Sequence, residues 1–192
     1  MEKLAVFLSL KGKKIVVVGG GSAALIKIKT LLDIQADFEV ISKEYSNQTE
    51  KILKENAVMY QKREIKKEDI KDVFIVFAAA EKNINDTIAQ WAKEQKVLCC
   101  KADGKGDFIV PYHKREGKLT VAVSTDGLFP LLGKKICENI DLSIAKELYH
   151  LGEKRKNIIE HIDDKKERKK ALEQLLKEYQ TNEKEYQNWD KR

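Results

Sequence analysis

Residues 15–24 read Ile15-Val-Val-Val-Gly-Gly-Gly-Ser-Ala-Ala24, an apolar run that stops on three glycines. Four β-branched residues in a row predict a strand buried on both faces of a parallel sheet. A helical pattern follows the glycines, with apolar residues spaced along one face at Leu25, Ile28, Leu31 and Leu32. A strand, a glycine-rich turn and a helix in this order predict the first unit of an open α/β fold.

The glycine-rich turn fits the G-x-G-x-x-G/A pattern of dinucleotide-binding folds. In this pattern Gly19 makes the tight turn, Gly21 lets the backbone approach a pyrophosphate, and Ala24 keeps helix and strand close. The helix that begins near Ser22 directs free N–H groups and the positive end of its dipole at the phosphates. The residues expected to hold the pyrophosphate are therefore Gly19, Gly20, Gly21, Ser22, Ala23 and Ala24.

The end of the second predicted strand bears on the choice between NAD and NADP. An acidic residue is usual about 20 residues after the glycines, where it holds the ribose hydroxyls. This chain has Ser42 and Lys43 there, while Glu39 lies in the middle of the predicted strand. We expect Ser42 and Lys43 to face the cofactor, and they leave both NAD and NADP open.

Strand and helix patterns alternate with short connections along residues 1–110. This alternation predicts a doubly wound parallel sheet with right-handed crossovers, a Rossmann domain spanning residues 1–110. The most apolar later run, residues 73–78, is expected to be a central strand. The expected later strands are 38–42, 57–60, 73–78 and 97–100, and the expected helices are 49–56 and 84–95.

The pattern changes after residue 110, and two further regions are predicted. Residues 111–150 are predicted to be a dimerisation region. Around its start, the runs 108–111 and 119–124 flank the turn-like 114–117 and predict a β-hairpin. The helix that Pro130 opens carries Leu131, Leu132, Ile136, Ile140 and Ile144 on one face. This small unit has little interior of its own, so we expect it to form a homodimer interface. Residues 151–192 predict an amphipathic helical pair with a charged outer face.

The composition of the 192 residues narrows the class of protein. The apolar stretches are shorter than a membrane span needs, and the start of the chain lacks a secretory h-region, so no membrane partner is expected. Three cysteines form neither a zinc knuckle nor a disulfide framework, which favours the cytoplasm. The net charge of +6 suits a polyanionic small molecule, because no helix-turn-helix or aromatic-interleaved basic stripe points to nucleic acid. The three histidines lack ligand spacing, so no metal site is predicted.

Several strings, in their order and spacing, resemble the precorrin-2 dehydrogenase family, the stand-alone form of the dehydrogenase/ferrochelatase module of siroheme synthases. The resemblance spans residues 4–145. Its parts are Phe7-Leu-Ser-Leu-Lys-Gly-Lys13, Val16-Val-Val-Gly-Gly-Gly21, Phe77-Ala-Ala-Ala80 with Asn85, Phe108-Ile-Val-Pro111, and Val121-Ala-Val-Ser-Thr-Asp-Gly127 with Pro130. It implies a Rossmann domain, a dimerisation region with intertwined subunits and a helical C-terminal part.

The resemblance also implies a reaction, the oxidation of precorrin-2 to sirohydrochlorin with NAD as hydride acceptor. It implies a key acid after the fifth strand, where Asp103 stands, and it adds Ala79, Ala80 and Asn85 to the expected cofactor site. A carboxylate at Asp103 would take a proton or hold a macrocycle nitrogen; the alternative is a loop aspartate that stabilises its own turn with Gly104.

The implied substrate is rich in carboxylates. Basic residues that follow the fifth predicted strand could bind these carboxylates, because charge-assisted hydrogen bonds to carboxylates are strong. Each of these side chains taken singly is also a normal solvated surface residue. The residues expected to bind the substrate are Lys101, Lys105, His113, Lys114, Arg115, Ser124 and Thr125.

The sequence thus predicts a homodimeric, NAD-dependent precorrin-2 dehydrogenase of siroheme or cobalamin synthesis. Some members of the family also insert iron. We expect weak or absent metal insertion here, since the sequence shows no grouping of histidines and carboxylates. The competing hypothesis is a non-catalytic dinucleotide sensor that signals through its helical tail.

Overall fold

The computed structural model describes residues 3–102 and 106–189, with side chains given up to residue 179. The chain divides into two compact units, Met1–Val110 and Pro111–Arg192, and each is described by itself.

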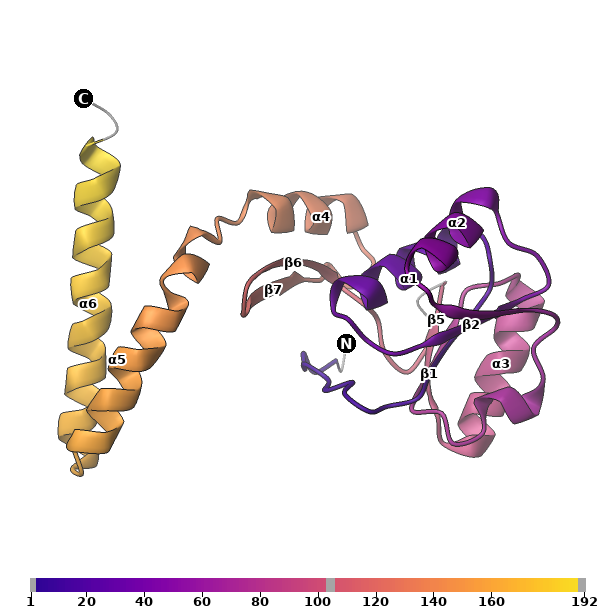
Figure 1. Ribbon diagram of the computed structural model, residues 1–192, viewed down its shortest axis with the longest axis horizontal. Helices are drawn as coiled ribbons and strands as arrows, with labels where there is room; N and C mark the ends of the chain where they lie inside the picture. The colour runs from indigo at the N-terminus through magenta and orange to yellow at the C-terminus, as the bar shows by residue number, and fades with distance from the viewer. Residues whose placement is uncertain (1–2, 103–105, 190–192) are drawn as a thin grey trace. The chain divides into compact units, whose positions relative to one another are not determined.

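The first unit contains a parallel five-stranded sheet in the order β3-β2-β1-β4-β5. Figure 1 labels β1, β2 and β5 of this sheet. Its strands are β1 (Ile15–Val18), β2 (Glu39–Ser42), β3 (Met59–Lys62), β4 (Ile75–Ala78) and β5 (Leu98–Lys101). Its helices are α1 (Ser22–Asp33), α2 (Asn47–Glu55) and α3 (Lys82–Gln95), with the short 3-10 helix η1 (Lys67–Ile70) before β4. The α/β fold class predicted from the sequence is confirmed, and each predicted element of this unit lies within a few residues of its place.

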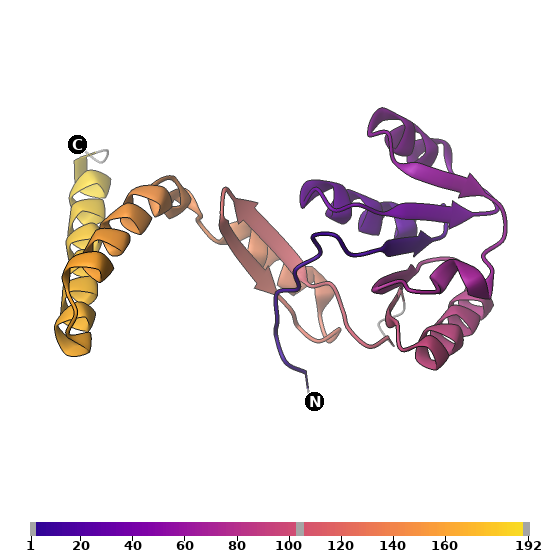
Figure 2. The ribbon, with the colours of Figure 1, turned by 60° about the horizontal axis from the view of Figure 1, so that its bottom comes forward.

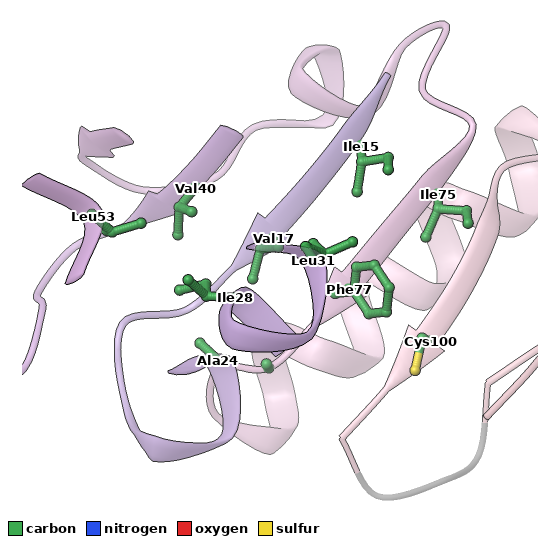
Figure 3. Packing of buried hydrophobic residues seen from close by; sticks show 11 residues of the cluster. Ile15, Val17, Ala24, Ile28, Leu31, Val40, Leu53, Ile75, Phe77 and Cys100 are labelled. Atoms are coloured by element: carbon green, nitrogen blue, oxygen red, sulfur yellow. The ribbon is translucent and has the colours of Figure 1, made fainter. Parts of the chain in front are cut away.

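Alternate residues of each central strand enter two separate cores, as the two-residue period of a strand requires. Ile15 and Val17 pack with Ile28 and Leu31 of α1, and this core is seen in Figure 3. Val16 and Val18 pack on the opposite face with Ile88 of α3. All four β1 side chains are buried, which explains the unbroken apolar run. The strand order reverses beside β1, and the carboxyl ends of β1 and β4 form the edge where open α/β sheets bind ligands.

The second unit contains a two-stranded antiparallel sheet of β6 (Tyr112–Glu116) and β7 (Leu119–Val123), followed by helices (Figure 2). These are α4 (Pro130–Asn139), η2 (Ser143–Lys146), α5 (Leu148–His161) and α6 (Lys165–Trp189). Helix α4 packs on the hairpin, and α5 packs along α6. Within the described residues, no helix is long and apolar enough to cross a membrane.

The predicted second strand of the hairpin, 119–124, agrees with β7, but the predicted position of the first strand is wrong by several residues. The run 108–111 is not its first strand, because Phe108 packs edge-on against Phe77 of the first unit with ring centroids 5.9 Å apart. The backbone N–H of Asp107 donates to the carbonyl of Cys99 at 2.8 Å, so this segment lies along β5. The reversal occurs at Gly117 and Lys118, between the paired residues Glu116 and Leu119.

Candidate functional site

The glycine turn is held from both sides at the carboxyl end of β1. The N–H of Gly19 donates to the carbonyl of Ile41 on β2 at 3.0 Å, and the N–H of Ala79 donates to the carbonyl of Val18 at 2.9 Å. The N–H of Ser46 donates to the carbonyl of Gly20 at 3.0 Å. The segments that follow β1, β2 and β4 therefore meet at one edge of the sheet, as the sequence predicts.

The three glycines of the turn have different surroundings. Gly19 has a φ of +124°, and a Cβ there would overlap the carbonyl oxygen of Ala79. A Cβ on Gly20 would overlap the carbonyl oxygen of Glu44. At Gly21, in contrast, no atom of the described residues lies within 4 Å of the position of a Cβ, and φ is an ordinary −92°. Packing of the chain therefore explains the first two glycines, while the third leaves an open approach to the backbone.

Helix α1 presents its amino terminus at this opening. Gly21 is the N-cap residue and has no side chain with which to cap the N–H groups of Ser22, Ala23 and Ala24. The first turn carries no acidic side chain, and Ala24 is fully buried against the sheet. Uncapped N–H groups and the positive end of the helix dipole favour an anion such as a pyrophosphate. The residues present therefore fit the diphosphate of a dinucleotide.

Asn85 holds the loop that follows β4. Its side chain is only 6% exposed. Its Oδ1 accepts from the N–H of Ala80 at 2.9 Å, and its Nδ2 donates to the carbonyl of the same residue at 2.9 Å. The amide of Asn85 thus shapes the Ala79–Ala80 segment beside the glycine turn, which makes it a positioning residue at the predicted cofactor site.

Ser42 and Lys43 follow β2 on the other side of the turn. The hydroxyl of Ser42 donates to the carbonyl of Glu44 at 2.7 Å, and the ammonium of Lys43 pairs with the carboxylate of Glu64. Tyr45 ties this segment to the sheet, because its hydroxyl donates to the carbonyls of Gln61 and Val40 at 2.8 and 3.1 Å. Burial raises the pKa of Tyr45 to about 12, so this anchor stays protonated at physiological pH.

Lys101, one of the residues expected to bind the substrate, has a buried side chain. It ends β5 with its side chain 8% exposed, and its Nζ lies 2.5 Å from the Oδ1 of Asp86 on α3. Its side chain follows Cys99 toward the α3 face of the sheet, because strand side chains alternate. The ammonium of Lys101 is thus paired with a carboxylate of helix α3.

Asp103 and Lys105 lie outside the described residues. The residue before them, Ala102, donates its N–H to the carbonyl of Ala78 at 3.0 Å. After them, the Oδ2 of Asp107 accepts from the N–H of Cys99 at 2.8 Å. Gly106 lies so close to β5 that a Cβ would overlap the carbonyl oxygen of Cys99. Ala102 therefore lies beside the end of β4, and Gly106 and Asp107 lie along β5.

The predicted substrate residues of the second unit fall into two groups. His113 and Arg115 share one face of the hairpin, opposite Ala122 and Thr120. Lys114 lies on the other face, where its Nζ donates to the carbonyls of Glu138 and Ile140 at 3.1 and 2.9 Å. His113 and Arg115 therefore lie on the face away from α4. The Lys114 ammonium lies at the carboxyl end of α4, where the helix dipole favours a positive charge.

Ser124 and Thr125 form the turn that leads into α4. The hydroxyl of Ser124 accepts from the N–H of Asp126 at 3.1 Å, and the hydroxyl of Thr125 accepts from the N–H of Phe129 at 3.3 Å. In the part of the chain that the structure describes, no three His, Cys, Asp or Glu side chains gather closely enough to hold a metal ion.

This geometry agrees with the comparisons to known proteins. The model of an NAD(P)-binding family matches residues 6–112. Precorrin-2 dehydrogenase of Bacillus subtilis is 34% identical over 140 residues, which are 72% of this chain and 86% of that protein. The chain belongs to the precorrin-2 dehydrogenase family. The precorrin-2 dehydrogenase of Priestia megaterium is 32% identical over 137 residues, 70% of this chain and 68% of that protein.

A solved member of the family has the same fold. The structure of SirC, a precorrin-2 dehydrogenase, superposes with a TM-score of 0.72 at 26% identity and covers 90% of this chain and 89% of that one. The siroheme synthase of Neisseria meningitidis is 28% identical over 156 residues, and this chain spans 32% of its length. The resemblance inferred from short strings is therefore confirmed over most of the chain.

Two residues beside the predicted cofactor site were not identified from the sequence. Tyr45 and Glu64 lie beside the end of β2, the first by its own loop and the second from the segment after β3. Glu64 follows the carboxyl end of a parallel strand, so the strand-end rule that drew attention to Ser42 would also have found it.

Proposed function

We propose that this protein oxidises precorrin-2 to sirohydrochlorin in siroheme biosynthesis, with NAD as the acceptor. The observation that carries this function is the glycine turn of a chain that belongs to the precorrin-2 dehydrogenase family. At Gly21, the third glycine, no described atom blocks the approach of a pyrophosphate to the backbone. Bound NAD supplies the hydride acceptor. The chain itself binds the pyrophosphate through the N–H groups at the start of α1 and orients the cofactor between the segments after β2 and β4.

The protein must also move a proton, and we assign this role to Asp103. The family's key acid follows the fifth strand, and Ala102 anchors the start of that connection next to the end of β4. Ligands of open α/β sheets bind beyond the carboxyl ends of such strands, which is where a general base has to act.

For the carboxylates of the substrate we propose His113 and Arg115. They project from the hairpin face that α4 does not cover, whereas Lys114 is bound to carbonyls at the end of α4. Lys105 belongs to the same proposal. Ser124 and Thr125 shape the turn before α4, and Lys101 is paired with Asp86.

The function is tested with purified protein, precorrin-2 and NAD. We expect sirohydrochlorin to accumulate, as measured by its absorbance, and NAD to be reduced in a stoichiometric amount. Omitting NAD is the control. Tight binding of NAD without turnover would contradict the proposal and favour a dinucleotide sensor.

We further propose a homodimer, formed by the exposed apolar surface of α4 and the turn before it. Small residues face inward on α4, where Gly133 and Cys137 are buried. The large residues face outward: Leu128 (91% exposed), Phe129, Leu131, Leu132 and Ile136. A contiguous apolar patch of this kind on a small unit is characteristic of an interaction site. A second copy presents the same patch, so a two-fold symmetric contact would cover both.

Charging this patch is expected to dissociate the dimer. We predict that Leu131→Glu with Ile136→Glu yields a monomer by light scattering at micromolar concentration, because burying two unpaired carboxylates is costly. Lys156→Glu makes a charge change at an exposed position of α5, outside this patch, and should leave the dimer intact. A wild-type monomer under these conditions would exclude the interface.

We also place the protein in a reducing compartment such as the cytoplasm. Cys99, Cys100 and Cys137 are buried and form no disulfide within the described residues. Burial raises the pKa of the Cys100 thiol, which keeps it protonated and unreactive.

A further inference from the structure

The segment after β2 lies directly against the glycine turn. The N–H of Ser46 donates to the carbonyl of Gly20, and Gly20 lacks a Cβ that would overlap the carbonyl oxygen of Glu44. Tyr45 fixes the segment to β2 and β3 through its hydroxyl. In dinucleotide-binding folds the adenosine ribose lies at the carboxyl end of the second strand, so Lys43, the residue after β2, stands where NAD and NADP differ.

A carboxylate reaches this position from the segment that follows β3. The N–H of Arg63 donates to the carbonyl of Ser42 at 2.9 Å and extends the pairing of β2 and β3 beyond their ends. This contact brings the next residue, Glu64, to Lys43, where the two side chains form an ion pair. The pair raises the pKa of Lys43 and lowers the pKa of Glu64, so both groups are charged at neutral pH.

Two further carboxylates act on Lys43. Glu81 and Glu44 act on the Lys43 ammonium and raise its pKa further. The nearby guanidinium of Arg63 is directed at Asp69, with N–O distances of 2.7 and 2.8 Å. A 2′-phosphate would therefore meet an ammonium that is already paired and a surplus of carboxylates, whereas a 2′-hydroxyl can donate to a carboxylate.

We propose that Glu64 determines the specificity of this protein for NAD over NADP, by holding the Lys43 ammonium and by offering the acceptor for the ribose hydroxyl that β2 itself lacks. This inference rests on the proposed function, in which the glycine turn binds the dinucleotide. It also accounts for a second strand that ends in Ser42-Lys43, a pattern that leaves NADP open when the sequence is considered alone.

The test measures the Kd of NAD and of NADP separately by calorimetric titration, without substrate. In Glu64→Gln the freed Lys43 should favour the 2′-phosphate, and we expect the ratio of the NADP Kd to the NAD Kd to fall about tenfold. The double variant Lys43→Gln/Glu64→Gln should lose most of this gain, because the gain depends on the ammonium.

Glu94→Gln is the matched control. It breaks an exposed pair of similar kind, Lys67–Glu94, whose Nζ–Oε2 distance is 2.6 Å and which joins η1 to the last turn of α3. We expect it to leave the Kd ratio unchanged. Circular dichroism and thermal melting verify that each variant is folded.

The outcomes separate the two proposals. Wild-type protein that binds NAD and rejects NADP, with the expected shift in Glu64→Gln alone, supports the inference. Wild-type binding of NAD with an unchanged ratio in Glu64→Gln overturns the inference and leaves the proposed function standing. Wild-type protein that binds neither dinucleotide overturns the proposed function, and the inference with it.

Discussion

Replacing Gly21 by aspartate is expected to abolish measurable NAD binding while the protein stays folded. No atom of the described residues lies within 4 Å of the new Cβ, and the backbone at this position is extended rather than left-handed. Aspartate is also a favoured N-cap residue, so α1 should not be weakened. The carboxylate would, however, occupy the approach of the pyrophosphate. Repulsion between charges about 4 Å apart costs about 4 kcal/mol at an effective dielectric constant of 20, enough to weaken binding roughly 1,000-fold.

Calorimetric titration with NAD and thermal melting measure the two halves of this prediction. Gly152→Asp is the matched control, since it adds the same side chain at another glycine with open space, on α5 of the second unit. Gly20→Asp should instead fail to fold, because its Cβ would overlap the backbone at Glu44. An unchanged affinity in Gly21→Asp would mean that the cofactor binds elsewhere.

Replacing Asp103 by asparagine is expected to lower kcat about 10²–10⁴-fold, the usual contribution of a general acid or base. The Kd of NAD should change little, because the pyrophosphate is held by backbone groups of the glycine turn. The pH profile of kcat/KM should also lose the ionisation of the proton acceptor. Steady-state kinetics across pH and direct titration of NAD measure these three quantities.

Asp107→Asn provides the control on the same connection. An amide oxygen can still accept from the N–H of Cys99, so we expect kcat to stay within a few-fold of wild type. Near-normal dehydrogenation by Asp103→Asn would remove Asp103 from the mechanism. Parallel assays with Co²⁺ or Fe²⁺ and sirohydrochlorin should show slow metal insertion, and rapid insertion by wild type would contradict a single activity.

The sequence by itself determined the first unit of the fold and the approximate place of the cofactor. β1 is buried on both faces, so its sequence has to be continuously apolar, and the glycine turn is a local requirement of φ and of close approach. Such signals lie within a few neighbouring residues. Alternating strands and helices then restrict the topology, since crossovers in a parallel sheet are right-handed.

The first hairpin strand was misplaced because its local signal does not identify its packing partner. Residues 108–111 are apolar and suit a strand, but Phe108 packs against Phe77, a partner far away in the sequence. An apolar run shows that a segment is buried without showing against what. The sequence placed the turn at 114–117, and the pairing of Glu116 with Leu119 moves the reversal to Gly117 and Lys118.

Only the tertiary structure decided what the individual charged side chains do. Lys101, Lys114 and Lys43 are equivalent as letters in a sequence, yet they contact Asp86, the end of α4 and Glu64, respectively. Each contact joins residues on different elements, and its existence depends on strand register, side-chain alternation and helix placement. The charge of a lysine is local, but its partner is set by the fold, because electrostatic and hydrogen-bond energies depend on distances that no local pattern contains.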